Sequence, residues 1–382
     1  MDLTFDEDSE AFRHEVREFL DANRDHFPTK SYDTREGFDQ HRTWDKVLFD
    51  AGLSVIAWPQ KYGGRDASLL QWVVFEEEYF RAGAPGRASA NGTSMLAPTL
   101  FAHGTTEQLD RVLPKMASGE EIWAQAWSEP ESGSDLASLR STATRTEGGW
   151  LLNGQKIWSS RAVFGERAFG LFRSDPQAQR HKGLTYFMFD LHAQGVTVRP
   201  IAQLGGDTGF GEIFLDDVFV PDEDVIGEPN DGWRAAMSTS SNERGMSLRS
   251  PARFLAPAER LVQQWKSNPD PAFTDRVADA WIKAQAYRLH TFGTVTRLAG
   301  GGELGAESSV TKVFWSDLDV ALHQTALDLQ GADAEIVDHT TEGLLFALGG
   351  PIYAGTNEIQ RNIIAERLLG LPREISGGKP KS

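Results

Sequence analysis

Four segments of this sequence carry residue types that ligand binding or catalysis requires. They are Ala126–Ala137, Asn153–Ser160, Ser241–Gly245 and Pro351–Arg361. In the first segment, small residues allow close backbone approach to a ligand, and the hydroxyls of Ser128 and Ser134 can donate hydrogen bonds to carbonyl or phosphate oxygens. The same composition is also typical of an ordinary loop beside a strand.

The other three segments likewise have a functional and a structural interpretation. Trp158 stands at a predicted strand end, where its indole could cover a flat ring or simply close a core. Glu243 beside Arg244 is a candidate general base if it is buried, and half of a surface ion pair if it is exposed. Thr356 and Glu358 begin a predicted helix, whose free N–H groups suit a phosphate or carbonyl oxygen but could equally be capped locally.

Several other kinds of site are excluded or disfavoured by what the sequence lacks. It contains no cysteine, which rules out disulfides, thiolate metal sites, iron–sulfur clusters and a cysteine nucleophile. None of the nine histidines has another histidine four residues away, so we expect no metal site. The P-loop motif is absent, and the single Gly-x-Gly-x-x-Gly, at 300–305, follows a helical pattern instead of a strand. Any dinucleotide must therefore be bound by a fold of another type.

Charge and hydropathy limit the partners. The net charge of −17, from 55 acidic and 38 basic residues, argues against a broad nucleic-acid-binding face. The N-terminal residues are acidic where a targeting peptide would be basic. The longest uncharged run, 88–106, contains asparagine, proline and histidine and is too polar to span a bilayer. These features predict a cytoplasmic protein that does not enter the membrane.

The elements that must position the four segments change character twice along the chain. Residues 1–120 show helical periodicity, as at Trp44–Ala51. Residues 121–228 contain short strand patterns with no long helical pattern between them, and Asn153-Gly154 is a hairpin signal. Residues 229–382 return to helical periodicity. We therefore predict an α+β protein with an N-terminal helical domain, a middle antiparallel, barrel-like β-domain and a C-terminal helical domain.

Taken together, in this order and at these distances, the four segments resemble the acyl-CoA dehydrogenase family. Further matching motifs extend the resemblance over nearly the whole chain: Trp58–Gly64, Arg180–Leu184, Asp217–Pro221 and Gln360–Arg367. The resemblance implies that the third domain is a four-helix bundle. It also implies an FAD-dependent oxidoreductase of lipid metabolism that removes two hydrogens from Cα and Cβ of an acyl-CoA, with flavin N5 as the hydride acceptor.

Site residues are carried over from the family position by position. The resemblance implies an FAD site formed by Trp127, Ser128, Ser134, Trp158, Ser160, Thr356 and Glu358. It places Ser134 also near the CoA arm and turns Arg244 toward the acyl-CoA substrate. No metal site is implied.

The catalytic base requires a choice between two positions. Many family members carry it directly before the Gly-Thr of the last segment, where this chain has Ala354, which cannot titrate. Others, including relatives of isovaleryl-CoA dehydrogenase and several steroid side-chain enzymes, carry it before the arginine of the Glu-Arg pair, where this chain has Glu243. The resemblance thus implies Glu243 as the base, and it leaves the Ala354 N–H as a donor to the thioester oxygen. The small Ala354 favours a bulky acyl group, such as a branched or steroid-derived one.

A second departure concerns assembly. Family members usually carry an Arg-x-x-Phe-Gly segment that reaches the FAD of a neighbouring subunit, and the corresponding stretch, Val262–Pro271, lacks it. The chain is therefore expected to form a homotetramer or, with a second dehydrogenase subunit that supplies the arginine, a heterotetramer. An electron-transfer flavoprotein or a similar protein is the expected acceptor. An acyl-CoA oxidase and a non-catalytic partner subunit remain alternatives.

Overall fold

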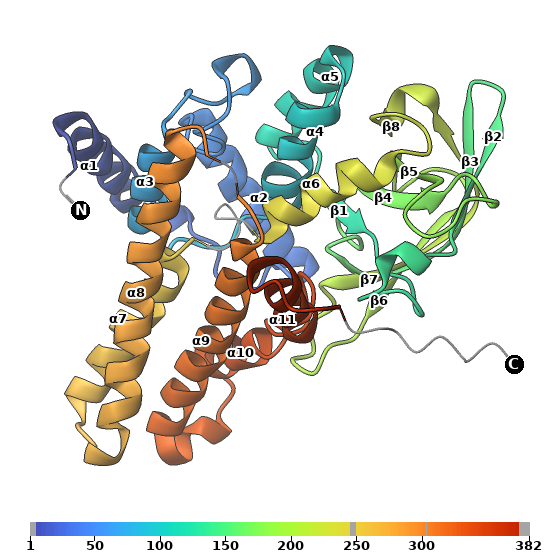
Figure 1. The fold of residues 1–382 in the computed structure, drawn as a ribbon. Helices are drawn as coiled ribbons and strands as arrows, with labels where there is room; N and C mark the ends of the chain where they lie inside the picture. Colours follow the sequence, from blue (N-terminus) through green and yellow to red (C-terminus); the bar gives the residue numbers. More distant parts are fainter. Residues whose placement is uncertain (1–4, 245–249, 303, 374–382) are drawn as a thin grey trace, which may run out of the picture. The chain divides into compact units, whose positions relative to one another are not determined.

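The computed structural model describes residues 5–244, 250–302 and 304–373, and for residues 241–244 it describes the backbone alone (Figure 1). The chain divides into two compact units, unit 1 (Met1–Glu243) and unit 2 (Arg244–Ser382). Unit 1 contains the first helices and the sheet, and unit 2 contains the C-terminal helices. The predicted order of helices, sheet and helices is confirmed.

Unit 1 begins with helices that pack through apolar faces. They are α1 (Glu7–Ala22), α2 (Arg35–Asp50), α3 (Leu69–Arg81), α4 (Ala97–His103) and α5 (Thr106–Ala117). The sequence specifies the start of α3 locally, because Ser68 and Gln71 form a capping box. Val16, Trp44 and Phe75, from α1, α2 and α3, are buried together in one core. Burial of such large side chains supplies most of the stabilisation of these helices.

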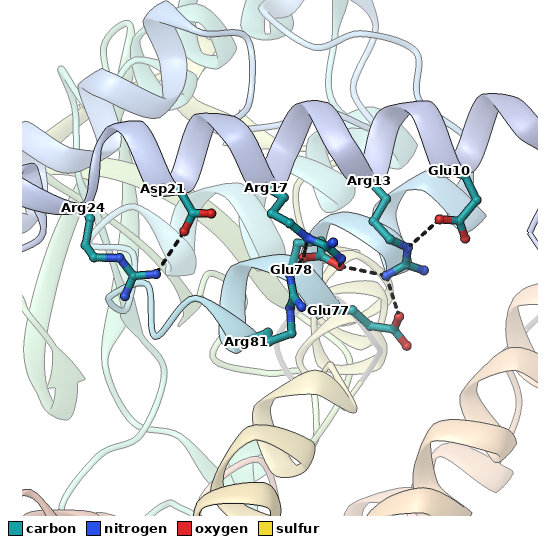
Figure 2. A network of polar contacts seen from close by, with 8 residues as sticks. All are labelled: Glu10, Arg13, Arg17, Asp21, Arg24, Glu77, Glu78 and Arg81. Atoms are coloured by element: carbon teal, nitrogen blue, oxygen red, sulfur yellow. Dashed lines mark hydrogen bonds and ion pairs between the residues drawn. The ribbon is translucent and has the colours of Figure 1, made fainter.

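A polar network joins α1 to α3 beside this core (Figure 2). Glu78 of α3 is buried and receives hydrogen bonds from Arg13 at 3.0 Å and from Arg17 at 3.1 Å, both on α1, and pairs with Arg81 on its own helix. Burial alone would raise the pKa of Glu78, but the hydrogen bonds from Arg17 and Arg13 bring it below its ordinary value. The carboxylate therefore stays ionised and ties the two helices together.

The sheet of unit 1 is largely antiparallel, as predicted. Its strands are β1 (Trp123–Ala126), β2 (Thr142–Thr146), β3 (Gly149–Ser160), β4 (Arg167–Arg173), β5 (Leu184–Asp190), β6 (Val196–Ile201), β7 (Phe210–Pro221) and β8 (Val225–Ile226). They are ordered β6-β7-β3-β2-β4-β5-β8, and β1 pairs in parallel with β4. Leu152, Phe187 and Ile213, from β3, β5 and β7, lie in one buried cluster.

The hairpin predicted at Asn153-Gly154 is wrong. The turn between β2 and β3 lies at residues 147–148, and Asn153 and Gly154 stand inside β3, where the register with β7 shifts. A Cβ on Gly154 would lie 2.2 Å from the Ser141 hydroxyl, so only glycine allows this close approach to the segment just before β2. An Asn-Gly dipeptide favours backbone with positive φ. A bulge inside a strand accommodates such backbone as well as a hairpin turn does.

The last helix of unit 1 is α6 (Gly232–Arg244), which ends at the division between the units. Unit 2 contains α7 (Ala252–Ser267), α8 (Thr274–Ala299), α9 (Glu307–Gln330), α10 (His339–Ala347) and α11 (Asn357–Ile363). Phe254, Tyr287 and Trp315, from α7, α8 and α9, form the centre of its core. Within the described ranges, no helix has the length and apolar character needed to cross a membrane.

Candidate active site

The Trp-Ser-Glu-Pro segment is held in place by a buried ion pair. Lys156 of β3 is fully buried, and its Nζ donates to Glu129 Oε1 and to the Leu171 carbonyl, each at 2.8 Å. The other donors to the Glu129 carboxylate are the N–H groups of Arg140 at 2.6 Å and Ser141 at 3.0 Å. The glutamate of this segment therefore shapes the loop and is not free to contact a ligand.

The ionisation of this pair follows from its contacts. Burial opposes the charge of Glu129, but the ammonium of Lys156 and the hydrogen bonds to the carboxylate together bring the pKa of Glu129 below its ordinary value. The pKa of Lys156 is lowered by burial, and the carboxylate opposes that shift. Each charge thus depends on the other, because neither has water to solvate it.

The same contacts bring the first two candidate segments together. The Ile157 N–H donates to the Ser128 carbonyl at 2.9 Å, so Ser128 lies beside the end of β3 that carries Trp158. Trp127, just before it, donates its indole N–H to the Tyr186 hydroxyl at 3.1 Å. These two segments, predicted from separate motifs, therefore share one face of unit 1.

Trp158 has an unusual conformation at the end of β3. Its φ is +61°, a left-handed value that a bulky residue rarely adopts, and it lies at the second register shift with β7. Its side chain is 57% exposed and has an edge contact with Phe210, at 6.0 Å between ring centroids. A large apolar ring held out of the core by a strained backbone indicates a binding surface.

The hydroxyls that the resemblance assigned to a cofactor are available to a ligand. Among the described residues, no protein group is hydrogen-bonded to the hydroxyl of Ser128, Ser134 or Ser160, and all three side chains have access to solvent. By contrast, the Ser138 hydroxyl in the same loop donates to the Asp135 carbonyl at 2.7 Å. Free hydroxyls beside an exposed indole fit a flat ring with polar edges, which is the chemistry of a flavin.

The neighbouring β4–β5 loop is a feature that the sequence analysis did not assign to the site. Arg180 of this loop donates to Asp135 at 2.7 Å, directly after Ser134, and His181 packs on Trp233 with 4.4 Å between ring centroids. The loop thus places basic groups at the Ser134 end of the segment. The run of basic residues Arg180-His-Lys182 could have indicated this part of the site, but the sequence analysis used it only as evidence of the family resemblance.

The candidate base and its neighbour have a described backbone only. Glu243 and Arg244 form the last turn of α6, and their side chains lie outside the described part of the structure. Glu243 is four residues after Thr239, so the two positions share one face of the helix. Thr239 is completely buried.

The last segment forms a tight loop before α11 in unit 2. Ala354 and Gly355 have successive positive φ values of +57° and +80°, and Ala354 is 9% exposed. No acceptor among the described residues is hydrogen-bonded to the N–H of either residue. Thr356 caps α11 by accepting the Ile359 N–H at 3.3 Å, and Glu358 is exposed on the first turn. The loop therefore presents free N–H groups, which suit an oxyanion.

Buried polar groups that the sequence analysis missed hold this loop. Asn357 Oδ1 accepts from the completely buried Lys312 at 2.8 Å and from Ser316 at 3.0 Å, both on α9. Gln360 Nε2 donates to the Ala354 carbonyl at 3.3 Å. Asn357 and Gln360 stand in the quoted motif, but only the fold reveals that they turn inward.

Unit 1 also contains a cavity away from these residues. A surface cavity of about 840 Å³ in unit 1, lined by Gln108, Arg111, Trp150 and Asp222 among others, includes none of the predicted site residues. Among the described residues, no group of three or more histidine, aspartate or glutamate side chains could hold a metal ion. The stretch Val262–Pro271 forms the end of α7 and the turn to α8.

Family models and curated proteins show similarity along most of the chain. Family models for the N-terminal, middle and C-terminal domains of acyl-CoA dehydrogenases match residues 6–120, 124–218 and 230–369. The acyl-CoA dehydrogenase IpdE1 of Mycobacterium tuberculosis is 40% identical over 352 residues, which cover 90% of this chain and 91% of that protein.

Solved structures agree with the sequence relatives. The Tcur3481-Tcur3483 steroid ACAD superimposes with a TM-score of 0.87 at 26% identity, covering 98% of this chain and 100% of that one. The ChsE4-ChsE5 complex from Mycobacterium tuberculosis gives a TM-score of 0.84, with the same identity and coverage. The predicted three-part fold is thus found in proteins of known structure.

Proposed function

The chain belongs to the acyl-CoA dehydrogenase family, and we propose that it converts a bulky acyl-CoA to the trans-2-enoyl-CoA with FAD as cofactor and Glu243 as the base. Residues 1–120, 121–228 and 229–382 would be its N-terminal, β- and C-terminal domains. The observation that carries the proposal is the ligand-facing chemistry at Ser128 and Trp158, where free hydroxyls and an exposed ring meet on a strained backbone. A bulky residue keeps a left-handed backbone only where surrounding contacts enforce it, and such strain is concentrated at ligand-binding sites.

The residues present fit FAD. The unclaimed hydroxyls of Ser128, Ser134 and Ser160 would bind the polar edge of the flavin and its ribityl-phosphate arm, and Trp158 would cover the ring. When bound, FAD supplies the acceptor for the hydride that leaves Cβ. Trp127 would line the flavin while its indole N–H remains bonded to the protein. We also propose FAD contacts for Thr356 and Glu358, as the family resemblance implies.

Glu243 would remove the Cα proton. Family members carry the base at one of two positions, and in this chain one of them holds Ala354, which has no titratable group. This supports the assignment of Glu243. A carboxylate is too weak a base for a free thioester, so the enzyme must also stabilise the charge that develops on the thioester oxygen. The free N–H at Ala354, on a backbone held by Gln360, supports this second role. Arg244 would face the acyl-CoA.

A bulky substrate is supported by two observations. Ala354 replaces a glutamate where many family members carry one, which leaves volume next to the proposed oxyanion donor. The structure with a TM-score of 0.87 is titled a steroid ACAD. We therefore propose a steroid-derived or branched acyl group, with Ser134 beside the CoA arm. The role would be in steroid or fatty-acid degradation.

Assembly with a second dehydrogenase subunit is supported by what the chain lacks and what it exposes. The stretch Val262–Pro271 lacks the Arg-x-x-Phe-Gly segment that family members carry at the corresponding place, and the ChsE4-ChsE5 structure is described as a complex. Unit 2 exposes large apolar side chains at Ile336, Val337, Ile352 and Leu369, each at least 66% exposed. We propose a heterotetramer, in the cytoplasm, that passes its electrons to an electron-transfer flavoprotein or a similar acceptor.

The experiment measures anaerobic bleaching of the flavin by a panel of acyl-CoAs. Glu243→Gln should retain FAD and bind substrate while bleaching slows by about 10²-fold or more, as expected for loss of a general base. Glu342→Gln, on the exposed face of α10, is the matched control and should keep the wild-type rate. Near-normal bleaching in Glu243→Gln would refute the assignment. Fast reoxidation by oxygen with release of peroxide would indicate an acyl-CoA oxidase instead.

A further inference from the structure

Unit 1 contains a continuous chain of hydrogen bonds between buried side chains of distant segments. Trp127 Nε1 donates to the Tyr186 hydroxyl at 3.1 Å, and that hydroxyl lies 3.2 Å from Thr239 Oγ1. Thr239 Oγ1 in turn lies 2.7 Å from Thr99 Oγ1, and Thr99 donates to the Met95 carbonyl at 2.9 Å. Tyr186, Thr239 and Thr99 are all completely buried.

The chain of bonds has one consistent direction. An indole N–H can only donate and a carbonyl can only accept, so donation from the Trp127 end toward the Met95 end is compatible with both ends. The Ala235 carbonyl, 3.2 Å from Thr239 Oγ1, is a second acceptor for the Thr239 proton. Each hydroxyl between them can accept from the Trp127 side and donate toward the Met95 side. Every polar atom is then satisfied without water, which makes the network specific and costly to break.

Five segments of unit 1 meet at this network. Trp127 comes from the loop after β1, Tyr186 from β5 and Thr239 from α6. Thr99 lies in the first turn of α4, and Met95 lies in the π-helical turn η3 (Gly92–Leu96) that precedes it. The network thus ties the helix of the proposed base to the loop of the proposed flavin site. Both belong to unit 1, so the connection does not depend on the placement of unit 2.

Thr239 stands one helical turn before Glu243. Residues four apart on an α-helix face the same side, so a bond that fixes the rotation of α6 at Thr239 also fixes it at Glu243. The Thr239 hydroxyl lies 3.2 Å from the Ala235 carbonyl of its own helix, but a bond within one helix cannot orient that helix. The bonds to Tyr186 and Thr99 can, because their partners belong to other elements.

We propose that Thr239 is a positioning residue: its bonds to Tyr186 and Thr99 set the rotation of α6 and so the position of Glu243 on that helix. This inference rests on the proposed function, since it acts through Glu243. The effect of Thr239 on hydrogen exchange in α6 can nevertheless be tested without Glu243 being the base.

The chain supplies a matched control. Thr291 of α8 is also buried, and its hydroxyl donates at 3.0 Å to the Tyr287 carbonyl of its own helix, with no bond to another element among the described residues. Thr239→Val and Thr291→Val therefore remove the same hydroxyl and the same type of intrahelical contact. Only the first removes a link between elements.

The experiment compares hydrogen exchange and steady-state kinetics in these variants. In Thr239→Val, exchange over residues 232–244 should accelerate by about fivefold, the expected effect of losing one buried hydrogen bond. The kcat should fall by about tenfold with KM nearly unchanged, because misplacement of a base affects chemistry more than binding. Thr239→Ser should restore both, Tyr186→Phe should reproduce both losses, and Thr291→Val should show neither.

Two results would overturn the proposal. One is identical exchange over α6 in Thr239→Val and Thr291→Val. The other is faster exchange with no fall in kcat, which would make the network purely structural. Failure of the proposed function is seen separately, in Glu243→Gln, and the exchange comparison still decides whether Thr239 anchors α6.

Discussion

The buried pair of Lys156 and Glu129 gives the sharpest prediction on stability. Lys156→Met leaves the Glu129 carboxylate buried with only two backbone N–H donors. Glu129→Gln leaves the buried Lys156 ammonium with neutral acceptors only, namely the glutamine amide oxygen and backbone carbonyls, of which that of Leu171 lies at 2.8 Å. Removing one partner of a buried pair is far more costly than replacing both.

The cost of each single change has an upper limit, because the stranded group can become neutral. At pH 7, protonating a glutamate of ordinary pKa 4.5 requires about 3 kcal/mol, at about 1.4 kcal/mol per pH unit. Deprotonating a lysine of ordinary pKa 10.5 requires about 5 kcal/mol. We therefore expect losses of at most about 3 kcal/mol for Lys156→Met and at most about 5 kcal/mol for Glu129→Gln.

The two variants should respond to pH in opposite directions. In Lys156→Met the folded state favours a protonated Glu129, so the variant gains stability as pH falls and loses it as pH rises. In Glu129→Gln the folded state favours a neutral Lys156, so the variant gains stability as pH rises. The wild-type contribution of Glu129, whose pKa is lowered, is present at neutral pH and is lost as pH falls below 4.5.

Urea denaturation at about pH 5, 7 and 9 tests these signs, with the double variant Glu129→Gln/Lys156→Met as control. The double variant should recover most of the loss, because no charge remains buried. Similar pH slopes in the two single variants, or losses below about 1 kcal/mol, would show that the pair is solvated and the reasoning wrong. The single variants should also bind FAD more weakly, since Ser128 would lose its fixed place beside β3.

Two further predictions follow from buried charge and strained backbone. Burial raises the pKa of Asp45 to about 6, so the wild type loses about 2 kcal/mol of stability relative to Asp45→Asn as pH rises from about 4 to about 7. Urea denaturation midpoints of both proteins at the two pH values measure this loss, and the same midpoint difference at both values would contradict it. Trp158→Gly should raise the free energy of unfolding by about 1 kcal/mol by relieving the left-handed backbone, yet weaken FAD binding in a titration, and unchanged FAD affinity would exclude Trp158 from the site.

Much of the fold could be predicted because the relevant information is local. Hydrophobic periods of about 3.6 and of 2 residues distinguish the helical parts from the sheet, and they did so over nearly the whole chain. Where a local signal had two structural solutions, prediction failed. Asn153-Gly154 marked a bulge inside β3 instead of a turn, because only the pairing with β7 decides between them.

The candidate site was predictable in its residue types but not in its supports. Charged residues are expected at the surface, so nothing local indicated that Lys156 and Lys312 are completely buried. Their partners, Glu129 and Asn357, lie 27 and 45 residues away in sequence. The link from Tyr186 to Thr239 spans 53 residues. Contacts of this kind exist only once the tertiary structure has formed.

Backbone strain marks the same places as the sequence motifs do. Among the described residues, the positions at positive φ that are not glycine, asparagine or aspartate are Trp158, Arg161, Arg180 and Ala354. Trp158, Arg161 and Ala354 lie in or next to segments that the family resemblance assigns to FAD or acyl-CoA, and Arg180 is bonded to Asp135 of such a segment. Left-handed backbone at such residues opposes folding, and it persists only where surrounding contacts enforce it. The ion pair of Lys156 lies next to Trp158, and the buried amide of Asn357 lies next to Ala354. We propose that ligand binding explains both the strain and the buried polar groups that support it.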